Sequence, residues 1–336
     1  MSTVFTRTVD LERAGKDPMK DKAGREIDYM RISITDRCNL RCKYCMPGDI
    51  ETTDMANLLT YEEIAKVTET AASLGIRHIR LTGGEPLVRR GCVDLVKKIK
   101  NISGIDTVGM TTNGILLAEH ARALKEAGLD SVNVSLDTLD ETEFQRLTGR
   151  DELKAVLAGI GAAQEVEIPV KINTVHYKNL DWRAVLAYAD ERQIPVRFIE
   201  LMPIGYGAAY TGKSNEELFR QIEDCYGSAS EAGKHGAGPA VYYHFPGLNI
   251  EVGFISAIHH KFCESCNRIR LTSEGYLKLC LCYEKGVDLR AVLRDPEKGQ
   301  ALQEVMKKAI LEKPVEHCFE QISEMTEHKA MVRIGG

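Results

Sequence analysis

The sequence predicts an α/β fold: an incomplete (β/α)6 barrel that is closed by a C-terminal α+β layer. Between residue 29 and about residue 201, β-rich runs alternate with amphipathic helical segments, at a spacing of about thirty residues that is typical of parallel βαβ units. Roughly six such repeats fit into this stretch, which allows either an open doubly wound sheet or an incomplete barrel. One face of the expected strands is polar, and this observation favours the barrel.

The expected strands and helices are placed from the signals at their ends. Thr60 and Glu63 form a capping-box pattern in front of the first helix. Asp151 is expected to open the next-to-last helix of the repeats, and Asn179 or Asp181 the last. The six strands are expected at Tyr29–Thr35, His78–Thr82, Thr107–Thr111, Ser131–Asp137, Val170–Val175 and Val196–Leu201.

The two faces of these strands differ in polarity. Side chains alternate between the faces of a strand, and in the first strand Ile32 and Ile34 share one face. A sheet covered by helices on both sides would be apolar on both. A curved sheet around a solvated, ligand-lined interior therefore fits better than a doubly wound sheet. The polar positions are Arg31, Ser33, Thr35, His78, Arg80, Thr82, Asn133, Ser135, Asp137, Lys171 and Asn173.

The pattern changes after Pro203, so three regions are expected: an N-terminal extension over 1–28, a partial barrel over 29–202 and a C-terminal layer over 203–336. The run Ala229–Pro239 is rich in loop-forming residues. A helix through Tyr226, capped by Ser214 with Glu217, precedes it. Further strands are expected at Val241–Phe245, Ile250–Ser256, Arg268–Thr272 and Tyr276–Cys282, and helices near 288–294 and 297–311.

Composition argues against two classes of partner. The chain has 336 residues, 43% of them hydrophobic, and a formal net charge of −5. Lysines and arginines are spread along it, so no basic stripe for nucleic acid is expected. No apolar run is long enough to cross a bilayer, and the N-terminal residues lack the apolar centre of a signal peptide. We therefore expect a cytoplasmic protein that binds neither nucleic acid nor a membrane.

The ten cysteines are clustered along the chain. Three lie within 38–45 and four within 263–282, whereas Cys92, Cys225 and Cys318 are isolated. In a reducing compartment, clustered cysteines are more often metal ligands or catalytic groups than disulfides. The isolated cysteines are expected to be small buried hydrophobic residues.

The first cluster of cysteines has the spacing C-x3-C-x2-C: Cys38, Cys42 and Cys45. It follows the first expected strand, at the edge where parallel α/β sheets place their active sites. Three thiolates on one loop can hold three corners of a cubane iron–sulfur cluster. The fourth iron then has an open position for a substrate. A zinc site is the alternative, but zinc needs a fourth ligand and no histidine lies nearby in the sequence.

The C-terminal cysteines form a second set with the spacing C-x2-C-x13-C and one spare: Cys263, Cys266, Cys280 and Cys282. By itself, the C-x2-C pair could also be a corner of a structural zinc site. Arg268 and Arg270 lie two residues apart on the next expected strand. Two guanidiniums beside thiolates suit an anionic ligand.

The first triad resembles the signature of the radical S-adenosylmethionine superfamily, which has an aromatic residue before the last cysteine, here Tyr44. A second motif agrees, because Leu81–Pro86 (Leu-Thr-Gly-Gly-Glu-Pro) ends the second expected strand. Glycines there let the backbone approach a ligand, and the acidic neighbour can take an amine. In the superfamily this loop binds the amino group of the methionyl moiety.

The second cysteine set resembles that of the GTP 3′,8-cyclase family of molybdenum cofactor biosynthesis. The resemblance covers residues 18–336, including the final Gly335-Gly336. It implies two 4Fe–4S clusters, S-adenosylmethionine as a cofactor and GTP as the substrate, with the open iron of the second cluster at the purine. It also implies that the Gly-Gly tail reaches into the active site.

The resemblance implies roles for individual residues. Arg268 and Arg270 would orient the base and the phosphates, and so take part in catalysis. His78 departs from the family, because many members carry a lysine there, and no role is assigned to it. The implied cofactor-binding residues are Tyr44, beside the first cluster, and Gly84, Ser135 and Met202. The implied GTP contacts are Arg31, Arg80, Thr111, Lys171, Arg197, Arg268 and Arg270.

The implied reaction begins when the reduced first cluster cleaves S-adenosylmethionine to methionine and a 5′-deoxyadenosyl radical. This radical takes the 3′-hydrogen of GTP, and the ribose radical attacks C8 of guanine. The implied partners are an electron donor such as flavodoxin or ferredoxin, a downstream cyclic pyranopterin monophosphate synthase, and a second copy of the chain in a homodimer. Two alternatives stay open: a two-cluster radical enzyme that modifies a peptide, and an iron–sulfur or zinc redox sensor.

Overall fold

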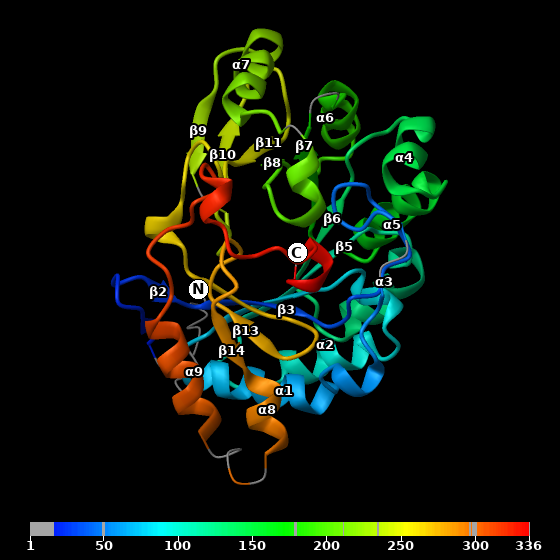
Figure 1. Cartoon of the computed structure of the whole chain (residues 1–336). Coiled ribbons are helices and arrows are strands. Elements are labelled where there is room, and N and C mark those ends of the chain that lie inside the picture. Colours follow the sequence, from blue (N-terminus) through cyan, green and yellow to red (C-terminus); the bar gives the residue numbers. More distant parts are fainter. Residues whose placement is uncertain are drawn as a thin grey trace, which may run out of the picture.

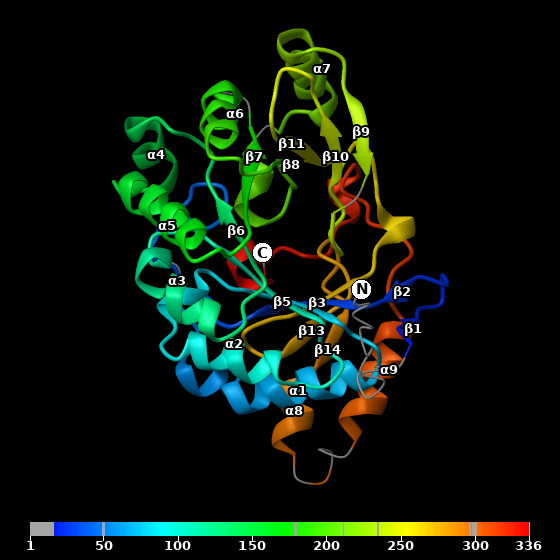
Figure 2. The same cartoon turned by 180° about the vertical axis from the view of Figure 1, so that it is seen from behind.

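The computed structural model describes residues 17–48, 51–177, 180–210, 212–233, 235–295, 297 and 301–335. In these ranges, the main feature is a curved sheet of twelve strands with helices on its outer side (Figures 1 and 2). A hairpin of β1 (Met19–Lys20) and β2 (Glu26–Ile27) precedes it. Residues 1–16 of the expected N-terminal extension and Gly336 of the expected tail lie outside the described residues.

The six strands of the predicted barrel all form. They lie side by side in chain order, each parallel to the next, and their ends agree with the predicted ranges to within two residues. Parallel neighbours need a crossover connection, and each crossover here contains a helix. The strands are β3 (Tyr29–Ser33), β4 (His78–Thr82), β5 (Thr107–Thr112), β6 (Ser131–Ser135), β7 (Val170–His176) and β8 (Val196–Glu200).

The crossover helices are α1 (Tyr61–Ser73), α2 (Cys92–Lys100), α3 (Leu117–Glu126), α4 (Glu141–Thr148), α5 (Leu153–Glu165) and α6 (Trp182–Glu191). The capping box predicted for α1 is present, because the Thr60 and Glu63 side chains each accept the other's backbone N–H. Asp181 caps α6 as predicted. The start predicted at Asp151 is wrong by one residue, since Glu152 is the N-cap of α5. The alternative cap Asn179 lies outside the described residues.

The two faces of the barrel strands differ as predicted. Ile32 and Ile34 are fully buried in the main core, together with Ile64 of α1. On the opposite face, Arg31 of β3 lies beside Arg80 of β4 in register. The polar face therefore lines the interior of the barrel, and the apolar face packs against the helices. None of the helices in the described ranges combines the length and the apolar character that crossing a bilayer requires.

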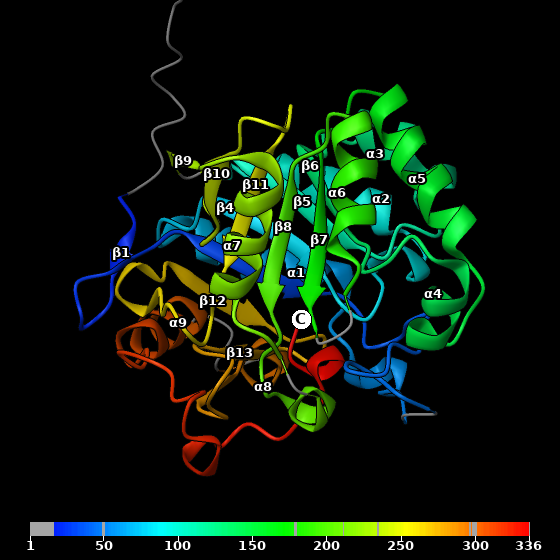
Figure 3. The ribbon, with the colours of Figure 1, turned by 90° about the horizontal axis from the view of Figure 1, so that it is seen from above.

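The C-terminal residues extend this sheet at both of its edges. β11 (Glu251–Ile255) pairs in parallel with β8, and β12 (Arg268–Leu271) pairs in parallel with β3. Figure 3 shows β11 and β10 beside β8. The predicted fold class is confirmed, and strands from both halves of the chain share one sheet. The outer antiparallel strands are β10 (Val241–His244), β9 (Ser230–Gly233), β13 (Tyr276–Lys278) and β14 (Gly286–Asp288).

Several details of the C-terminal part differ from the prediction. The strand expected at Tyr276–Cys282 ends at Lys278, and the helix expected at 297–311 begins at Leu302. Part of the expected loop Ala229–Pro239 forms the edge strand β9, which pairs with β10 across a register shift. A short polar edge strand has no apolar alternation to reveal it. Ser214 caps α7 (Asn215–Tyr226) as predicted, but its hydroxyl accepts from the backbone of Glu216 rather than Glu217. The last two helices are α8 (Leu289–Arg294) and α9 (Leu302–Leu311).

Candidate active site

Four cations follow one another across the interior face of the sheet. Lys278 of β13 is the register partner of Arg270 on β12, which is next to Arg31 on β3 and then Arg80 on β4. Register partners point to the same side of a sheet. The nucleotide contacts predicted at Arg31, Arg80 and Arg270 are therefore brought together. Lys278 was not predicted as part of this set, and its buried ammonium pairs with Glu327.

The next position in this row is Gly109 of β5. A β carbon there would lie 2.6 Å from Nη2 of Arg80, so the absence of a side chain leaves room for the guanidinium. Nε of Arg80 donates to the Tyr29 hydroxyl (2.9 Å), and Nη1 donates to the Met110 carbonyl (2.9 Å). Arg80 is thereby held over β5 inside the barrel.

The buried cations influence one another. Burial, together with the charges of Arg80, Arg268 and Arg197, lowers the pKa of Arg31 to about 10. Burial likewise lowers the pKa of Lys171 to about 8, with Arg197 and Arg80 adding to the effect. Like charges at such short range need an anion to offset them. The arrangement fits a polyanionic ligand.

Unpartnered polar atoms lie in the same interior. The buried Oγ1 of Thr111, Nη2 of Arg197 and hydroxyl of Tyr242 make no hydrogen bond of good geometry within the described residues. Nε of Arg197 donates to Asn173 Oδ1 (2.8 Å), and Nζ of Lys171 lies 5.2 Å from the centre of the Tyr242 ring. Buried polar groups are normally hydrogen-bonded. Arg197 and Tyr242 lie close enough to shift each other's pKa, so the Thr111 hydroxyl is the atom that points most clearly to a ligand. Tyr242 was not among the predicted site residues, because the sequence of its strand shows only that side chains alternate between the two faces.

The first cysteine set lies in the loop after β3. Burial raises the pKa of the Cys42 thiol well above its usual range, and the nearby Cys45 and Cys38 thiols raise it further. The three sulfurs therefore lie close together. The loop is fixed to the end of α4, because the backbone N–H groups of Arg41 and Lys43 donate to the carbonyls of Thr148 (2.7 Å) and Leu147 (3.0 Å).

The Gly-Gly-Glu-Pro turn packs directly on this cysteine loop. The N–H of Gly84 donates to the Thr35 carbonyl (2.7 Å), and the N–H of Glu85 donates to the Arg37 carbonyl (2.8 Å). A β carbon on Gly84 would lie 2.3 Å from the Arg37 carbonyl oxygen. Close approach of two backbones thus requires glycine here, whether or not a ligand also binds at Gly84.

The carboxylate of Glu85 is used inside the protein rather than left free for an amine. It is fully buried and accepts from the Thr112 hydroxyl (2.8 Å) and the backbone N–H groups of Leu87 (3.0 Å) and Asn113 (2.7 Å). The Asn113 amide in turn lies 3.8 Å from the Cys38 sulfur. Glu85 therefore positions the polar surroundings of the first cysteine.

The residues predicted to bind S-adenosylmethionine lie at the same end of the strands as Cys38. Ser135 is the exposed last residue of β6, and Met202 follows the end of β8. Tyr44 donates from its hydroxyl to Oδ2 of Asp137 (2.6 Å), and Oδ1 of Asp137 accepts from Val175 (2.8 Å). Asp137 thus holds the aromatic residue of the cysteine motif in place. The sequence indicated only that Asp137 lies on the polar face of its expected strand.

The second cysteine set lies at the opposite end of the sheet. Cys266 precedes β12, which runs parallel to β3, whereas Cys38 follows β3. Because β13 runs antiparallel to β12, Cys280 returns to the Cys266 end. Burial raises the pKa of the Cys263 thiol, and the neighbouring Cys266 and Cys280 thiols also raise it. The two predicted sets are therefore each brought together, one at either end of the cation row.

The donor sets fit iron–sulfur clusters. Among the described residues, no three cysteine, histidine or acidic side chains converge on a single metal ion, but each thiolate of a cubane binds a different iron. Burial would raise the pKa of Cys266, yet Lys313 and Arg268 lower it to about 7. The spare Cys282 is buried, and its sulfur lies 3.3 Å from that of Cys318.

Arg268 and Arg270 share the interior face of β12, as predicted, but make different contacts. Arg268 stacks 4.7 Å from the Phe262 ring centre, with Nη2 4.0 Å from the Cys266 sulfur. Nη1 of Arg270 donates to the carbonyl of Gly335 (2.7 Å). Gly335 is buried, and Figure 1 shows this end of the chain near the middle of the ribbon.

The segment before Gly335 also contacts the first cysteine set. The backbone N–H of Val332 faces the Cys45 thiol and partly offsets the rise of its pKa on burial. The guanidinium of Arg333 pairs with Asp36, which lies two residues before Cys38, at 2.9 Å. The tail thus runs between the first cysteine loop and Arg270. Its expected entry into the interior is seen as far as Gly335.

Two comparisons with known proteins agree with this geometry. Residues 32–191 match the family model described as Radical SAM superfamily, and residues 194–319 match that described as Molybdenum Cofactor Synthesis C. The chain is 45% identical over 324 residues to the GTP 3′,8-cyclase of Clostridium perfringens (strain 13 / Type A), covering 95% of this chain and 100% of the relative. The chain belongs to the GTP 3′,8-cyclase family.

Further relatives place the chain in the same family. The GTP 3′,8-cyclase of Petrotoga mobilis (strain DSM 10674 / SJ95) is 42% identical over 329 residues, covering 95% of this chain and 100% of the relative. The crystal structure of Streptococcus suis SuiB bound to S-adenosylmethionine has a similar fold, with a TM-score of 0.62 at 15% identity over 91% of this chain and 77% of SuiB. The resemblance read from the cysteine motifs is therefore confirmed.

His78, to which the sequence assigned no role, lies at the start of β4. Its Nδ1 is 2.9 Å from the Thr107 hydroxyl, and its ring lies 6.5 Å from that of Tyr29.

We expect Gly84→Ala to disturb the first cysteine set. The new β carbon would meet the Arg37 carbonyl at 2.3 Å, and the backbone can yield only if the cysteine loop moves. Overpacking typically destabilises by about 1–3 kcal/mol, so a lower unfolding temperature and less iron after reconstitution are expected. Gly161→Ala is the control, because no atom lies within 4 Å of its β carbon. Equal iron content in the two variants would contradict this explanation.

Proposed function

We propose that this chain cyclises GTP to (8S)-3′,8-cyclo-7,8-dihydroguanosine 5′-triphosphate, the first step of molybdenum cofactor biosynthesis, as a radical S-adenosylmethionine lyase. The observation that carries this proposal is the row of buried cations between two sets of three cysteines. A triphosphate carries about four negative charges and would offset them. The printed names of the relatives support the same substrate.

Each end of the barrel would bind a different iron–sulfur cluster. Cys38, Cys42 and Cys45 would hold a first 4Fe–4S cluster, which together with S-adenosylmethionine supplies the hydrogen-abstracting radical. Tyr44, Gly84, Ser135 and Met202 would bind S-adenosylmethionine at that end. Cys263, Cys266 and Cys280 would hold a second 4Fe–4S cluster, whose open iron would contact the purine.

The chain's own residues would bind, orient and shield the substrate. Guanidiniums in the interior would hold the triphosphate through bidentate hydrogen bonds. The unpartnered Thr111 hydroxyl and the Arg197 Nη2 supply further donors. Gly335 and the residues before it lie against the cysteine loop and Arg270, and would exclude water from the reacting atoms.

We also propose roles for the two regions of the chain, its partners and its location in the cell. We assign 29–202 to the radical-generating barrel and 203–336 to the part that carries the second cluster. An electron donor such as flavodoxin or ferredoxin, a downstream cyclic pyranopterin monophosphate synthase, a homodimer and a cytoplasmic location follow from the family resemblance and the clustered cysteines. No contact surface on the described residues singles out any of these proteins.

Anaerobically reconstituted protein tests the proposal. With dithionite, S-adenosylmethionine and GTP, it is expected to bind about eight iron atoms per chain, two cubanes, and to form the cyclised nucleotide. Zinc without iron would refute the proposal in favour of a zinc site. Two clusters that act on a peptide but leave GTP unchanged would favour the peptide-modifying alternative.

Cysteine variants should separate the two ends of the barrel. Cys38→Ala is expected to abolish S-adenosylmethionine cleavage but to keep the C-terminal cluster, because the two sets lie at opposite ends of the sheet. Cys266→Ala is expected to keep some uncoupled cleavage while losing the product from GTP. The measured quantities are 5′-deoxyadenosine, the cyclised nucleotide and iron per chain.

Cys225 was expected to be buried, but it is exposed and lies outside both sets, so Cys225→Ala is the matched control. Normal formation of 5′-deoxyadenosine by Cys38→Ala would show that the first set is wrongly assigned. Loss of cleavage with normal GTP binding in Cys266→Ala would reverse the two roles.

The arginines of β12 should matter for GTP but not for S-adenosylmethionine. Arg268→Ala and Arg270→Ala are each expected to weaken GTP binding by about 1.5–3 kcal/mol, the range for hydrogen bonds to charged groups, or roughly tenfold to hundredfold. Equilibrium binding of both ligands under anaerobic conditions measures this. Arg122→Ala, exposed on α3, is the control. Unchanged GTP affinity in both β12 variants would remove the nucleotide assignment.

GTP affinity should fall as the pH rises above about 8. Burial, Arg197 and Arg80 lower the pKa of Lys171 to about 8, so above this pH the free protein must take up a proton to present an ammonium to the triphosphate. The affinity is then expected to fall by at most about tenfold per pH unit. The Lys171→Arg variant should keep its affinity for GTP between pH 7.5 and 9, because its guanidinium stays charged over this range. Identical pH profiles for the two proteins would contradict this role.

A further inference from the structure

A buried lysine ties together two of the segments that carry the second cysteine set. Lys313 follows α9 and is 6% exposed. Its Nζ donates to the carbonyls of Arg268 (2.9 Å) and Leu279 (2.6 Å). Arg268 comes two residues after Cys266, and Leu279 directly precedes Cys280. One ammonium group therefore holds the backbone beside two of the three cysteines.

The third cysteine, Cys263, is held by Arg25 and by residues that closely follow Lys313. Nη1 of Arg25 donates to the carbonyls of Cys263 (2.9 Å) and Val315 (2.6 Å), and its Nη2 donates to that of Pro314 (2.7 Å). The backbone N–H of His317 faces the Cys263 thiol and partly offsets the rise of its pKa on burial. The segment 313–317 and Arg25 thus contact the chain at or beside all three cysteines of the second set.

The charges of these two cations are balanced differently. Arg25 forms an ion pair with Asp21, and their side chains are 5% and 0% exposed. Within the described part of the chain, no carboxylate forms an ion pair with Lys313, whose bonds all go to neutral carbonyls. An uncompensated buried charge is unfavourable by several kcal/mol. Lys313 exerts the strongest attraction of any cation on the Cys266 thiolate, ahead of Arg268.

We propose that Lys313 is a positioning residue and counter-charge for the second iron–sulfur cluster. It fixes the segments that carry Cys266 and Cys280, and it offsets the negative charge of the ligated cluster. This inference rests on the proposed function, which places a cluster there. Because reduction adds one negative charge to a cluster, a nearby cation stabilises the reduced form and raises the reduction potential.

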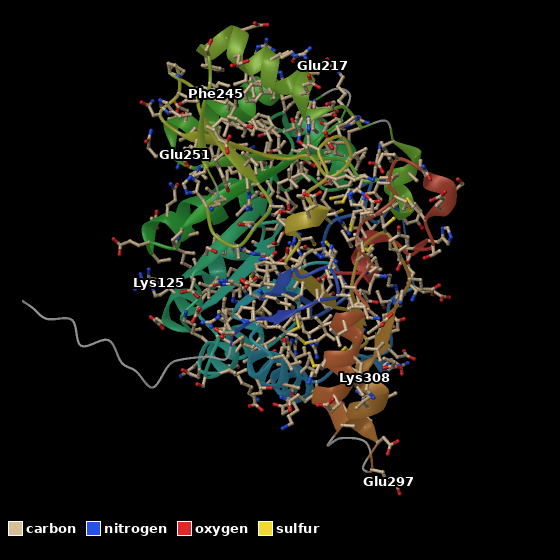
Figure 4. All side chains as sticks on the ribbon, turned by 90° about the vertical axis from the view of Figure 1, so that its left-hand side faces the viewer. Lys125, Glu217, Phe245, Glu251, Glu297 and Lys308 are labelled. Carbon is tan, nitrogen blue, oxygen red and sulfur yellow. The ribbon has the colours of Figure 1, made fainter. Side chains whose placement is uncertain are left out.

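The test uses a background in which only the second cluster can bind: Cys38→Ala, Cys42→Ala and Cys45→Ala in one full-length chain. Lys313→Met removes both the charge and the hydrogen bonds. Lys313→Gln keeps N–H donors without the charge, and Lys313→Arg keeps both. Lys308→Met is the matched control, since Figure 4 shows Lys308 on the exposed side of α9.

Two quantities are measured after anaerobic reconstitution: iron per chain, and the midpoint potential from a titration followed by electron paramagnetic resonance. We expect Lys313→Met to lose at least half of the roughly four iron atoms of one cubane. Lys313→Gln should retain more iron but show a lower midpoint potential. Lys313→Arg and Lys308→Met should match the background in both quantities. Should Lys313→Met fail to fold, as judged by circular dichroism, Lys313→Gln decides.

Iron content and potential equal to the background in both Lys313→Met and Lys313→Gln would overturn the inference and leave the proposed function intact. A background protein that binds no iron would overturn the two-cluster function, and the role of Lys313 with it. The two failures are therefore distinguishable from the same set of samples.

Discussion

Buried positive charge on one face of the sheet is the constraint on which the rest of the structure depends. Arg270, Arg31 and Arg80 occupy successive strands at the same level. Two unit charges 5 Å apart repel by about 3 kcal/mol at an effective dielectric constant of about 20, whereas a whole domain is stable by only about 5–15 kcal/mol. Each cation therefore needs a nearby dipole, such as the Tyr29 hydroxyl or the Gly335 carbonyl, and an anionic ligand offsets what these dipoles leave.

The direction of the strands decides where the chemistry sits around this charge. Because β12 runs parallel to β3, the cysteines before β12 and those after β3 lie at opposite ends of the barrel. The antiparallel return of β13 then brings Cys280 back to Cys266. Cations from both halves of the chain lie between the two ends. Neither half holds a complete site without the other.

Backbone contacts fix the first cysteine loop more than side chains do. The loop forms backbone hydrogen bonds with the end of α4 and with the Gly-Gly-Glu-Pro turn, and Asp36 before it pairs with Arg333 of the C-terminal segment. Gly84 permits the closest of these approaches. The same C-terminal segment reaches Arg270 through Gly335, so residues near the end of the chain contact both the first cysteine loop and the interior arginines.

The sequence by itself determined the features that depend on near neighbours in the chain: strand alternation, the capping box at Thr60, the spacing of both cysteine sets and the polar lining of the barrel. The tertiary structure decided the partners of buried groups. Lys278 meets Glu327 across 49 positions of sequence, and Lys313 meets Arg268 across 45. The alternation of polar and apolar residues shows which face of a strand a residue occupies. The partner that makes a buried charge stable comes from a distant segment, and only the completed sheet brings that segment near.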